Sequence, residues 1–342
     1  MSIELLLGTY TRGESEGVYQ VELNQAEKKL ENLSLIAKVG SPTYLAKNDQ
    51  EDILYAIVNE EGEGGILSLV KDADGNIRRQ EVLVSEGPSP AYIAYDEKRE
   101  FIYTSNYHKG ELAVYSSDDA GNLEKLDSVL HSGSSVHENQ TSSHVHYSDL
   151  TPDEKYLAVC DLGTDELYTY EVDEQGQLTE IARLKVKAGS GPRHLTFHPN
   201  GKIAYLFAEL SSEIIVLDYD SKTGQFSERQ TISSIPESHQ SFNGGAALRL
   251  TADAKFLYAS NRGHDSIAIF ETNDLGELSI LDYVASEGKT PRDFNFDPSE
   301  SFLIVGHQDS DNLTLFERNK ENGQLALLQK DFYAPEVVNI LQ

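Results

Sequence analysis

The segment ELYTYEVDEQGQL, residues 166–178, decides the fold. Aromatic and β-branched residues alternate with polar ones, a polar turn with Asp173 and Gly176 follows, and Leu178 opens a new apolar stretch. This order is typical of a β-hairpin. The pattern occurs seven times: GVYQVELNQAEKKL (17–30), GILSLVKDADGNI (65–77), ELAVYSSDDAGNL (111–123), ELYTYEVDEQGQL (166–178), IIVLDYDSKTGQF (214–226), IAIFETNDLGEL (267–278) and LTLFERNKENGQL (313–325).

A second hairpin precedes six of these copies, as in YIAYDEKREFIYTSNY (92–107). Each carries one anchor residue in its second strand, and the anchors recur every 46 to 55 residues. That period indicates four-stranded blades of a β-propeller. The anchors are Tyr55, Tyr103, Ala158, Tyr205, Tyr258 and Ile304.

The two ends of the chain supply the seventh blade. Residues 5–35 contain only its outer part, and residues 335–341 read as a lone strand that would complete it. Joining them leaves no open inner edge. The periodicity of two, without a sustained helical stripe, excludes a helical fold. We therefore predict an all-β, seven-bladed β-propeller of four antiparallel strands per blade, formed by residues 1–342 as a single domain.

The composition limits the possible functions. The chain has 28 Lys and Arg against 57 Asp and Glu, a formal charge of -29, which disfavours binding to nucleic acid or to an anionic membrane. The sequence contains no long apolar run, and we expect no leader segment. A single cysteine, Cys160, excludes an internal disulfide framework. We expect a soluble, cytoplasmic protein that is a monomer or a weak homodimer.

Equivalent positions of the repeats should converge at one mouth of the central channel. At the start of the inner strands the repeats align Thr43, Ala91, His146, Arg193, Ala246 and Arg292. Just past the next strand they align Glu60, Tyr107, Leu162, Glu209, Arg262 and Gln308. His144, His194 and His264 lie beside these columns. Cations that are held close together destabilise a protein. So many cationic residues at one mouth of an acidic chain therefore predict a pocket for a small anion.

The remaining histidines share no column and are expected at surface or turn positions: His108, His131, His137, His198, His239 and His307. His144 and His146 could face one side of a strand as two metal ligands, but no third ligand stands at a suitable position. We therefore expect neither a metal nor a cofactor.

Several of these segments resemble the lactonase family of seven-bladed propellers, over nearly the whole chain. They are GTYTRGESEGVY (8–19), HVH (144–146), GSGPRHLTFHPNGKIAY (189–205), AELSS (208–212), YASNRGHDSIAIF (258–270) and GKTPRDFNFDP (288–298). The best-known activity of that family is 6-phosphogluconolactone hydrolysis in the pentose phosphate pathway, and a fungal branch contains carboxymuconate-lactonising enzymes. The resemblance points to His146, Arg193, Glu209 and Arg262 as site residues. Ala208 and Ala247 differ from the Asn and Glu that the family usually has there.

Lactone hydrolysis needs a base, a positioned water and cationic donors for the oxyanion. We assign His146 as the base, Arg193 to the carbonyl or oxyanion, and Glu209 to orienting either Arg193 or His146. Arg262 and Arg292 are assigned to the anionic group of the substrate. The expected partner is therefore a small anionic lactone, with His144, His194, His264 and Glu60 also expected at the substrate.

Two other functions use the same sequence features. A cycloisomerase or lyase acting on a carboxymuconate-type dicarboxylate would move a proton with the same base and arginines. A non-catalytic scaffold or ligand-binding propeller is the third possibility, because a fold alone does not determine function.

Overall fold

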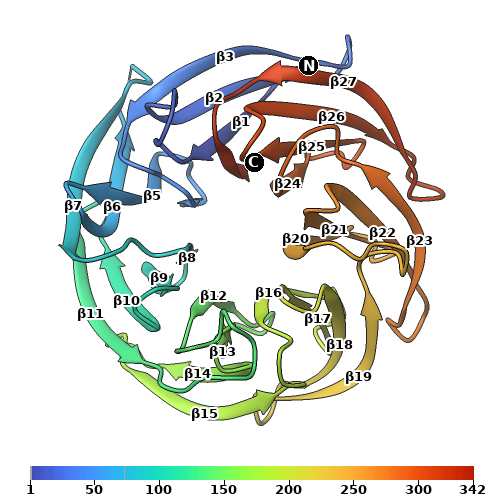
Figure 1. Cartoon of the computed structure of the whole chain (residues 1–342). Coiled ribbons are helices and arrows are strands. Elements are labelled where there is room, and N and C mark those ends of the chain that lie inside the picture. The colour runs from blue at the N-terminus through green and yellow to red at the C-terminus, as the bar shows by residue number, and fades with distance from the viewer. Residues whose placement is uncertain (1, 73) are drawn as a thin grey trace.

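A computed structural model describes residues 2–72 and 74–342. The described residues form seven four-stranded antiparallel sheets arranged as blades around a central channel (Figure 1). No stretch of them is helical, so no helix is long and apolar enough to cross a membrane. The predicted all-β, seven-bladed architecture is confirmed.

We number the blades in the order of their inner strands. Blade 1 contains β4 (Leu45–Lys47), β5 (Ile53–Glu60), β6 (Glu63–Lys71) and β7 (Ile77–Glu86). Blade 2 contains β8 (Tyr92–Asp96), β9 (Phe101–Asn106), β10 (Glu111–Ser117) and β11 (Leu123–Leu130). Blade 3 contains β12 (Val145–Leu150), β13 (Tyr156–Asp161), β14 (Glu166–Val172) and β15 (Leu178–Lys185). Blade 4 contains β16 (Pro192–Phe197), β17 (Ile203–Ala208), β18 (Glu213–Asp220) and β19 (Gln225–Ser233). Blade 5 contains β20 (Gly244–Leu250), β21 (Phe256–Arg262), β22 (Ser266–Thr272) and β23 (Leu278–Ala285). Blade 6 contains β24 (Pro291–Phe296), β25 (Phe302–His307), β26 (Asn312–Arg318) and β27 (Leu325–Tyr333). Blade 7 contains β28 (Val337–Leu341), β1 (Ser2–Thr9), β2 (Gly17–Asn24) and β3 (Lys29–Lys38).

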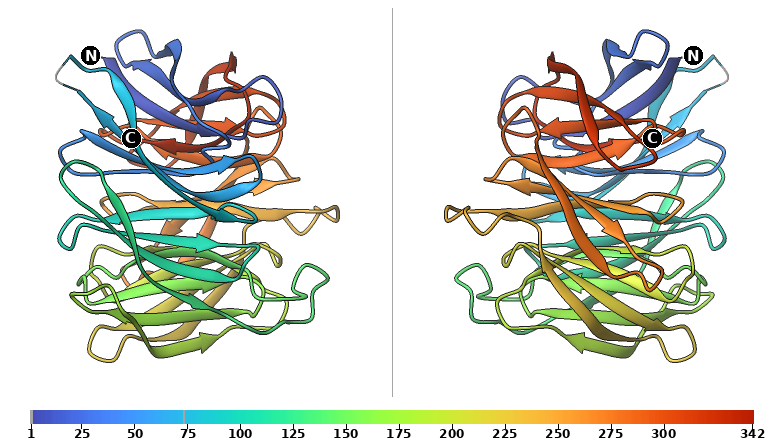
Figure 2. Two further views of the ribbon diagram at one scale, coloured as in Figure 1. Left: turned by 90° about the vertical axis from the view of Figure 1, so that its left-hand side faces the viewer. Right: turned by 90° about the vertical axis from the view of Figure 1, so that its right-hand side faces the viewer.

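Blade 7 closes the ring as the sequence predicted. The C-terminal strand β28 is its inner strand and pairs antiparallel with β1, from Leu6 opposite Leu341 to Thr9 opposite Val337. The blue N-terminal strands and the red C-terminal strands lie side by side in both side views (Figure 2). The two ends of the chain are therefore joined by backbone hydrogen bonds within one sheet.

Buried polar side chains connect inner strands on both sides of the closure. Asp293 of β24 is 3.1 Å from Arg249 of β20 and accepts hydrogen bonds from the Asn339 side chain and the Ile340 amide of β28, both 2.9 Å. Asn339 in turn accepts a 3.1 Å bond from the Leu45 amide of β4. Four consecutive inner strands are thus linked by satisfied buried groups, as burial requires.

The hydrophobic core lies between the blades. One of its seven clusters joins Tyr205 and Phe207 of blade 4 to Leu248, Leu257 and Phe270 of blade 5. The central strands read as continuous buried runs because each has a neighbouring blade on both faces. Each blade is therefore stabilised mainly by its two neighbours.

Glycines in the outer hairpin turns receive hydrogen bonds from the preceding blade. Their φ angles are positive, a conformation that glycine adopts without strain. In each case a buried hydroxyl donates to the glycine carbonyl: Ser68 to Gly121 (2.6 Å), Thr169 to Gly224 (2.8 Å), Tyr205 to Gly276 (3.0 Å) and Tyr258 to Gly323 (2.6 Å). The repeated turn motif therefore also joins neighbouring blades.

We predict that Gly323→Ala destabilises the protein more than Gly75→Ala does. Both glycines have positive φ, 73° and 85°, so each substitution costs about 1 kcal/mol of backbone strain. A Cβ at position 323 would lie 2.5 Å from Phe256 Cδ1, whereas at position 75 the nearest atom is Lys71 Cε at 3.9 Å. Overpacking should add roughly 1–3 kcal/mol at position 323 alone. Scanning calorimetry of both variants measures the difference, and equal melting temperatures would contradict this account of the blade junction.

Candidate functional site

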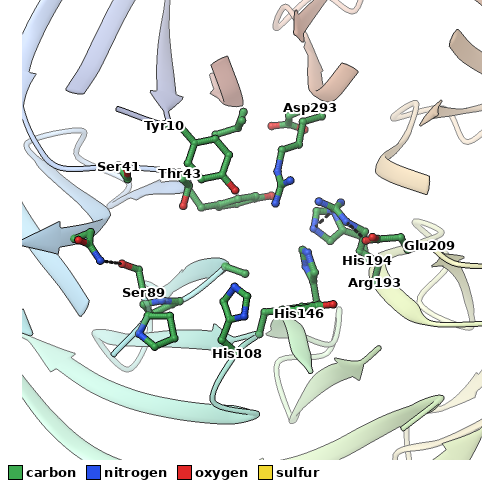
Figure 3. A pocket seen from close by; sticks show the side chains of 18 of the residues that line it. Tyr10, Ser41, Thr43, Ser89, His108, His146, Arg193, His194, Glu209 and Asp293 are labelled. Atoms are coloured by element: carbon green, nitrogen blue, oxygen red, sulfur yellow. Dashed lines mark hydrogen bonds and ion pairs between the residues drawn. The ribbon is translucent and has the colours of Figure 1, made fainter. Parts of the chain in front are cut away.

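A cavity of about 410 Å³ opens at one end of the channel (Figure 3). Five of the six residues in the first predicted column line it: Thr43, Ala91, His146, Arg193 and Arg292. The sixth, Ala246, accepts a 2.5 Å hydrogen bond from Arg193 Nη1 through its carbonyl oxygen. The inner strands therefore bring this column to one point, as the repeat alignment implied.

One carboxylate is shared by two arginines. Glu209 follows β17, and its two oxygens lie 2.9 Å from Arg193 Nε and 2.9 Å from Arg262 Nη2. The Glu209 side chain is 19% exposed and that of Arg193 only 3%. Burial favours a neutral carboxyl, but Arg262 and Arg193 outweigh it and lower the pKa of Glu209. Glu209 is therefore an anion that positions the two guanidinium groups.

Arg193 occupies the most buried position of the group. Burial, followed by the charge of Arg262, lowers the pKa of Arg193 to about 9, so the group stays cationic at neutral pH. Its Nη1 donates to the Ala246 carbonyl and lies 3.3 Å from His194 Nε2. Its Nε faces Glu209. These contacts leave Nη2 for a ligand.

His146 is a buried neutral imidazole beside these cations. Burial and the charge of Arg193 hold the pKa of His146 well below its usual range, and Arg292 and Arg262 act in the same direction. The side chain is buried, and its Nδ1 has no hydrogen-bond partner among the described residues. Since Nδ1 is itself enclosed by protein atoms, Nε2 is the ring nitrogen that can accept a proton from a molecule in the cavity.

A cluster of four aromatic rings, the aromatic floor, lies against the cavity, and two of its members, Tyr44 and His194, line it. Tyr44, Tyr92 and Tyr147 follow the first column by one residue and form a row, with ring centroids 4.4 Å and 4.7 Å apart. His194 holds the same position in blade 4 and lies 5.3 Å from His146, ring to ring. Burial and Arg193 keep the pKa of His194 well below its usual range, and burial raises that of Tyr44 to about 12. A second cavity, of about 300 Å³, lies against the same four rings.

Another part of the lining is polar but uncharged. Ser41, Thr43, Asn59 and Ser89, from blade 1 and its junctions with blades 7 and 2, all line the cavity. In Figure 3 Ser41, Thr43 and Ser89 lie across the cavity from Arg193 and Glu209. The cavity thus has a cationic side and a side with hydroxyl and amide groups.

Three expected site residues do not line the cavity. Glu60 forms an ion pair with Arg79 outside the cavity, and Asn59 lines the cavity instead. Asn59 stands four positions after the anchor Tyr55, as Tyr107 stands four positions after Tyr103. A shift by one residue moves a side chain to the other face of a strand. The register assigned to Glu60 was therefore wrong.

His264 and His144 also lie outside the lining. His264 is in the turn after β21, where its Nδ1 lies 2.7 Å from Ser266 Oγ. His144 stacks on Tyr107 with ring centroids 4.1 Å apart, and its Nδ1 is 2.8 Å from the Tyr107 carbonyl oxygen. His144 therefore supports a lining residue rather than facing the ligand.

Sequence reasoning missed several lining residues. Tyr107 stood in the second column but was not selected, and the turn residue His108 follows it directly. Tyr10 and Arg12 lie in the loop between β1 and β2, where the split blade has no aligned inner hairpin. The expectation of surface positions was also wrong for His131 and His307, whose side chains are buried.

The charges of the lining explain what the cavity can hold. Four arginines line it, together with Glu209 and Asp293, and Asp293 is already paired with Arg249 behind the lining. The cavity is therefore cationic in a chain with a formal charge of -29. Within residues 2–72 and 74–342, no group of three or more His, Cys, Asp or Glu side chains is placed to hold a metal ion. The arrangement suits a small organic anion that reacts with water or loses a proton.

Comparison with known proteins is consistent across the chain. Residues 4–342 match the family model described as lactonase, 7-bladed beta-propeller. The 6-phosphogluconolactonase of Bacillus subtilis (strain 168) is 42% identical over 332 residues, which cover 96% of this chain and 95% of that protein.

Solved structures agree with this match. A crystal structure of a protein from Lactobacillus plantarum superimposes with a TM-score of 0.97 at 43% identity, covering 100% of this chain and 99% of that one. The periplasmic gluconolactonase of Pseudomonas aeruginosa gives a TM-score of 0.94 at 29% identity, covering 99% and 98%. The repeats, the closed ring and these matches together show that the chain belongs to the lactonase family of seven-bladed β-propellers.

Proposed function

We propose that this protein hydrolyses the lactone of an anionic sugar acid, with 6-phosphoglucono-1,5-lactone as the substrate. One observation carries the proposal: the buried imidazole of His146, which is neutral because its pKa is lowered, lines a cavity together with four arginines. A base and an oxyanion-stabilising cation are the two groups that ester hydrolysis needs.

The hydrolytic step follows from these groups. His146 removes a proton from a water as that water attacks the acyl carbon, and the developing oxyanion is stabilised by Arg193 through its free Nη2. Collapse of the tetrahedral intermediate breaks the bond to the ring oxygen. The imidazolium of His146 then returns the proton to that oxygen, which leaves the carboxylic acid product and a neutral catalyst.

Glu209 acts through the arginines. Because its pKa is lowered, it is a weak base, and both of its oxygens already face guanidinium groups. It holds Arg193 in place and offsets part of the repulsion between Arg193 and Arg262. We therefore assign it a positioning role.

The relatives support a lactone substrate. One is named for a phosphorylated gluconolactone and another for gluconolactone, so the lactone is the feature that their names share. The uncharged wall with Ser41, Thr43, Asn59 and Ser89 suits the hydroxyl groups of a sugar better than a second carboxylate. This favours a sugar lactone over the carboxymuconate-type dicarboxylate of the alternative cycloisomerase reaction.

We predict that His146→Ala lowers kcat/KM for 6-phosphogluconolactone by about 10²- to 10⁴-fold, the usual contribution of a general base. Arg193→Ala should lower it by about 10²- to 10³-fold through loss of the oxyanion donor. Acid release above the spontaneous rate gives both values.

His264→Ala is the matched control for these variants, because this histidine lies beside the second column but outside the cavity. It should keep wild-type turnover. Thermal unfolding shows whether the variants are folded. Wild-type rates for both folded variants, His146→Ala and Arg193→Ala, would remove the assignment of these residues as base and oxyanion donor.

We predict that kcat/KM stays constant well below pH 6.5 and falls only as His146 takes up a proton. The base must be unprotonated, and its pKa is lowered by burial and by the arginines, so activity is lost as the pH falls through that lowered pKa. Arg292→Gln removes one of these charges and should move the acid limb to higher pH. The measurement is kcat/KM for non-phosphorylated gluconolactone from about pH 4.5 to about pH 7, a range around and below the reference pKa of histidine. An acid limb of Arg292→Gln that coincides with that of the wild type would exclude His146 as the titrating base.

A further inference from the structure

We propose that Tyr10, Arg12 and Arg292 form a subsite for a phosphate monoester at the blade 7 side of the cavity. The inference rests on the proposed lactone hydrolysis and adds how the enzyme would select a phosphorylated lactone. It differs from the assignment made on the sequence, which paired Arg262 with Arg292, because Arg262 is bound to Glu209.

Two guanidinium groups gather at one aromatic ring. The Cζ atom of Arg12 lies 3.7 Å from the centroid of the Tyr10 ring, and that of Arg292 lies 5.7 Å from it. All three residues line the cavity. Contact with the ring face stabilises each cation without neutralising it. Both positive charges therefore lie within 5.7 Å of the centroid of the same ring.

These two arginines differ from the others of the site in having no carboxylate. Within the described ranges of the chain, neither forms an ion pair, and the polar side-chain contact of Arg292 is Gln308 Oε1 at 3.3 Å. Arg193 and Arg262 share Glu209 instead. In a chain with 57 acidic residues, two unpaired cations at one ring of the cavity suit a dianionic ligand.

The backbone of the Arg12 loop is fixed by the C-terminal segment. The carboxylate of Glu336 accepts hydrogen bonds from the amides of Arg12 (3.1 Å) and Gly13 (2.8 Å), and the Glu336 carbonyl accepts one from the Tyr10 amide (3.1 Å). Glu336 thereby occupies backbone amides and leaves the Arg12 guanidinium to the cavity. The loop is positioned before a ligand arrives, which reduces the ordering cost of binding.

The positions of the groups match a substrate with two ends. Arg193 and His146 come from blades 4 and 3, whereas Arg12 comes from blade 7 and Arg292 from the adjacent blade 6. Figure 3 shows Tyr10 and His146 on different sides of the cavity. A lactone ring at His146 can thus direct a phosphate on its exocyclic carbon toward Tyr10. Hydrolysis leaves the phosphate unchanged, so this contact should act on substrate binding more than on kcat.

The test compares 6-phosphogluconolactone with glucono-1,5-lactone at pH 7, for the wild type, Arg12→Gln and the double variant Arg12→Gln/Arg292→Gln. Each charge-assisted contact to phosphate should contribute about 10- to 100-fold. We expect kcat/KM for the phosphorylated lactone to fall by about that factor in Arg12→Gln and further in the double variant, mainly through KM. The value for glucono-1,5-lactone should fall far less. Arg79→Gln is the control, since Arg79 is paired with Glu60 outside the cavity.

The outcomes separate this inference from the proposed function. An equal loss on both lactones, or a wild type without preference for the phosphorylated one, would overturn the phosphate subsite and leave lactone hydrolysis standing. If the wild type hydrolyses neither lactone, the proposed function fails. Calorimetric binding of 6-phosphogluconate against gluconate then tests the subsite alone. Tighter binding of the phosphorylated acid that is lost in the double variant supports it, and equal affinity overturns it.

Discussion

Pairing of β28 with β1 is the constraint on which the rest of the structure depends. It joins the two ends of the chain in one sheet and makes the inner strand of blade 7 from the last residues. In a closed ring every inner strand has a neighbour on each side, so equivalent repeat positions meet at one end of the channel. The same segment carries Glu336, whose carboxylate holds the loop of Arg12. The strand that closes the ring therefore directly follows the residue that positions part of the cavity wall.

The cavity concentrates positive charge in an acidic protein. Glu209 balances part of it by binding Arg193 and Arg262, while Asp293 is occupied with Arg249. Burial and the remaining positive charge together lower the pKa of His146. Repulsion and desolvation of the arginines thus destabilise the free protein. The same arginines keep the base neutral and prepare the site for an anion.

The aromatic floor gives this charged cavity a rigid base. The rings of Tyr44, Tyr92 and Tyr147 contact one another, and His194 joins them beside Arg193. Such packed rings have few alternative rotamers, so they keep the column residues above them in place. Tyr44 and His194 line both the charged cavity and the second cavity.

The sequence alone determined the blades, their number and the closure by the two termini, because hairpin periodicity and turn residues are local signals that recur with each repeat. It also identified the first column and the pairing of Glu209 with Arg193 and Arg262, since equivalent positions of a closed ring converge. Its errors were local: Glu60 was placed one residue out of register, and His264 and His144 lie near the columns without lining the cavity. Only the tertiary structure placed Tyr10 and Arg12, because their loop belongs to the blade that the chain completes with its last strand. The direction of a side chain in such a loop depends on contacts with Glu336, more than 300 residues away, and no local pattern encodes them.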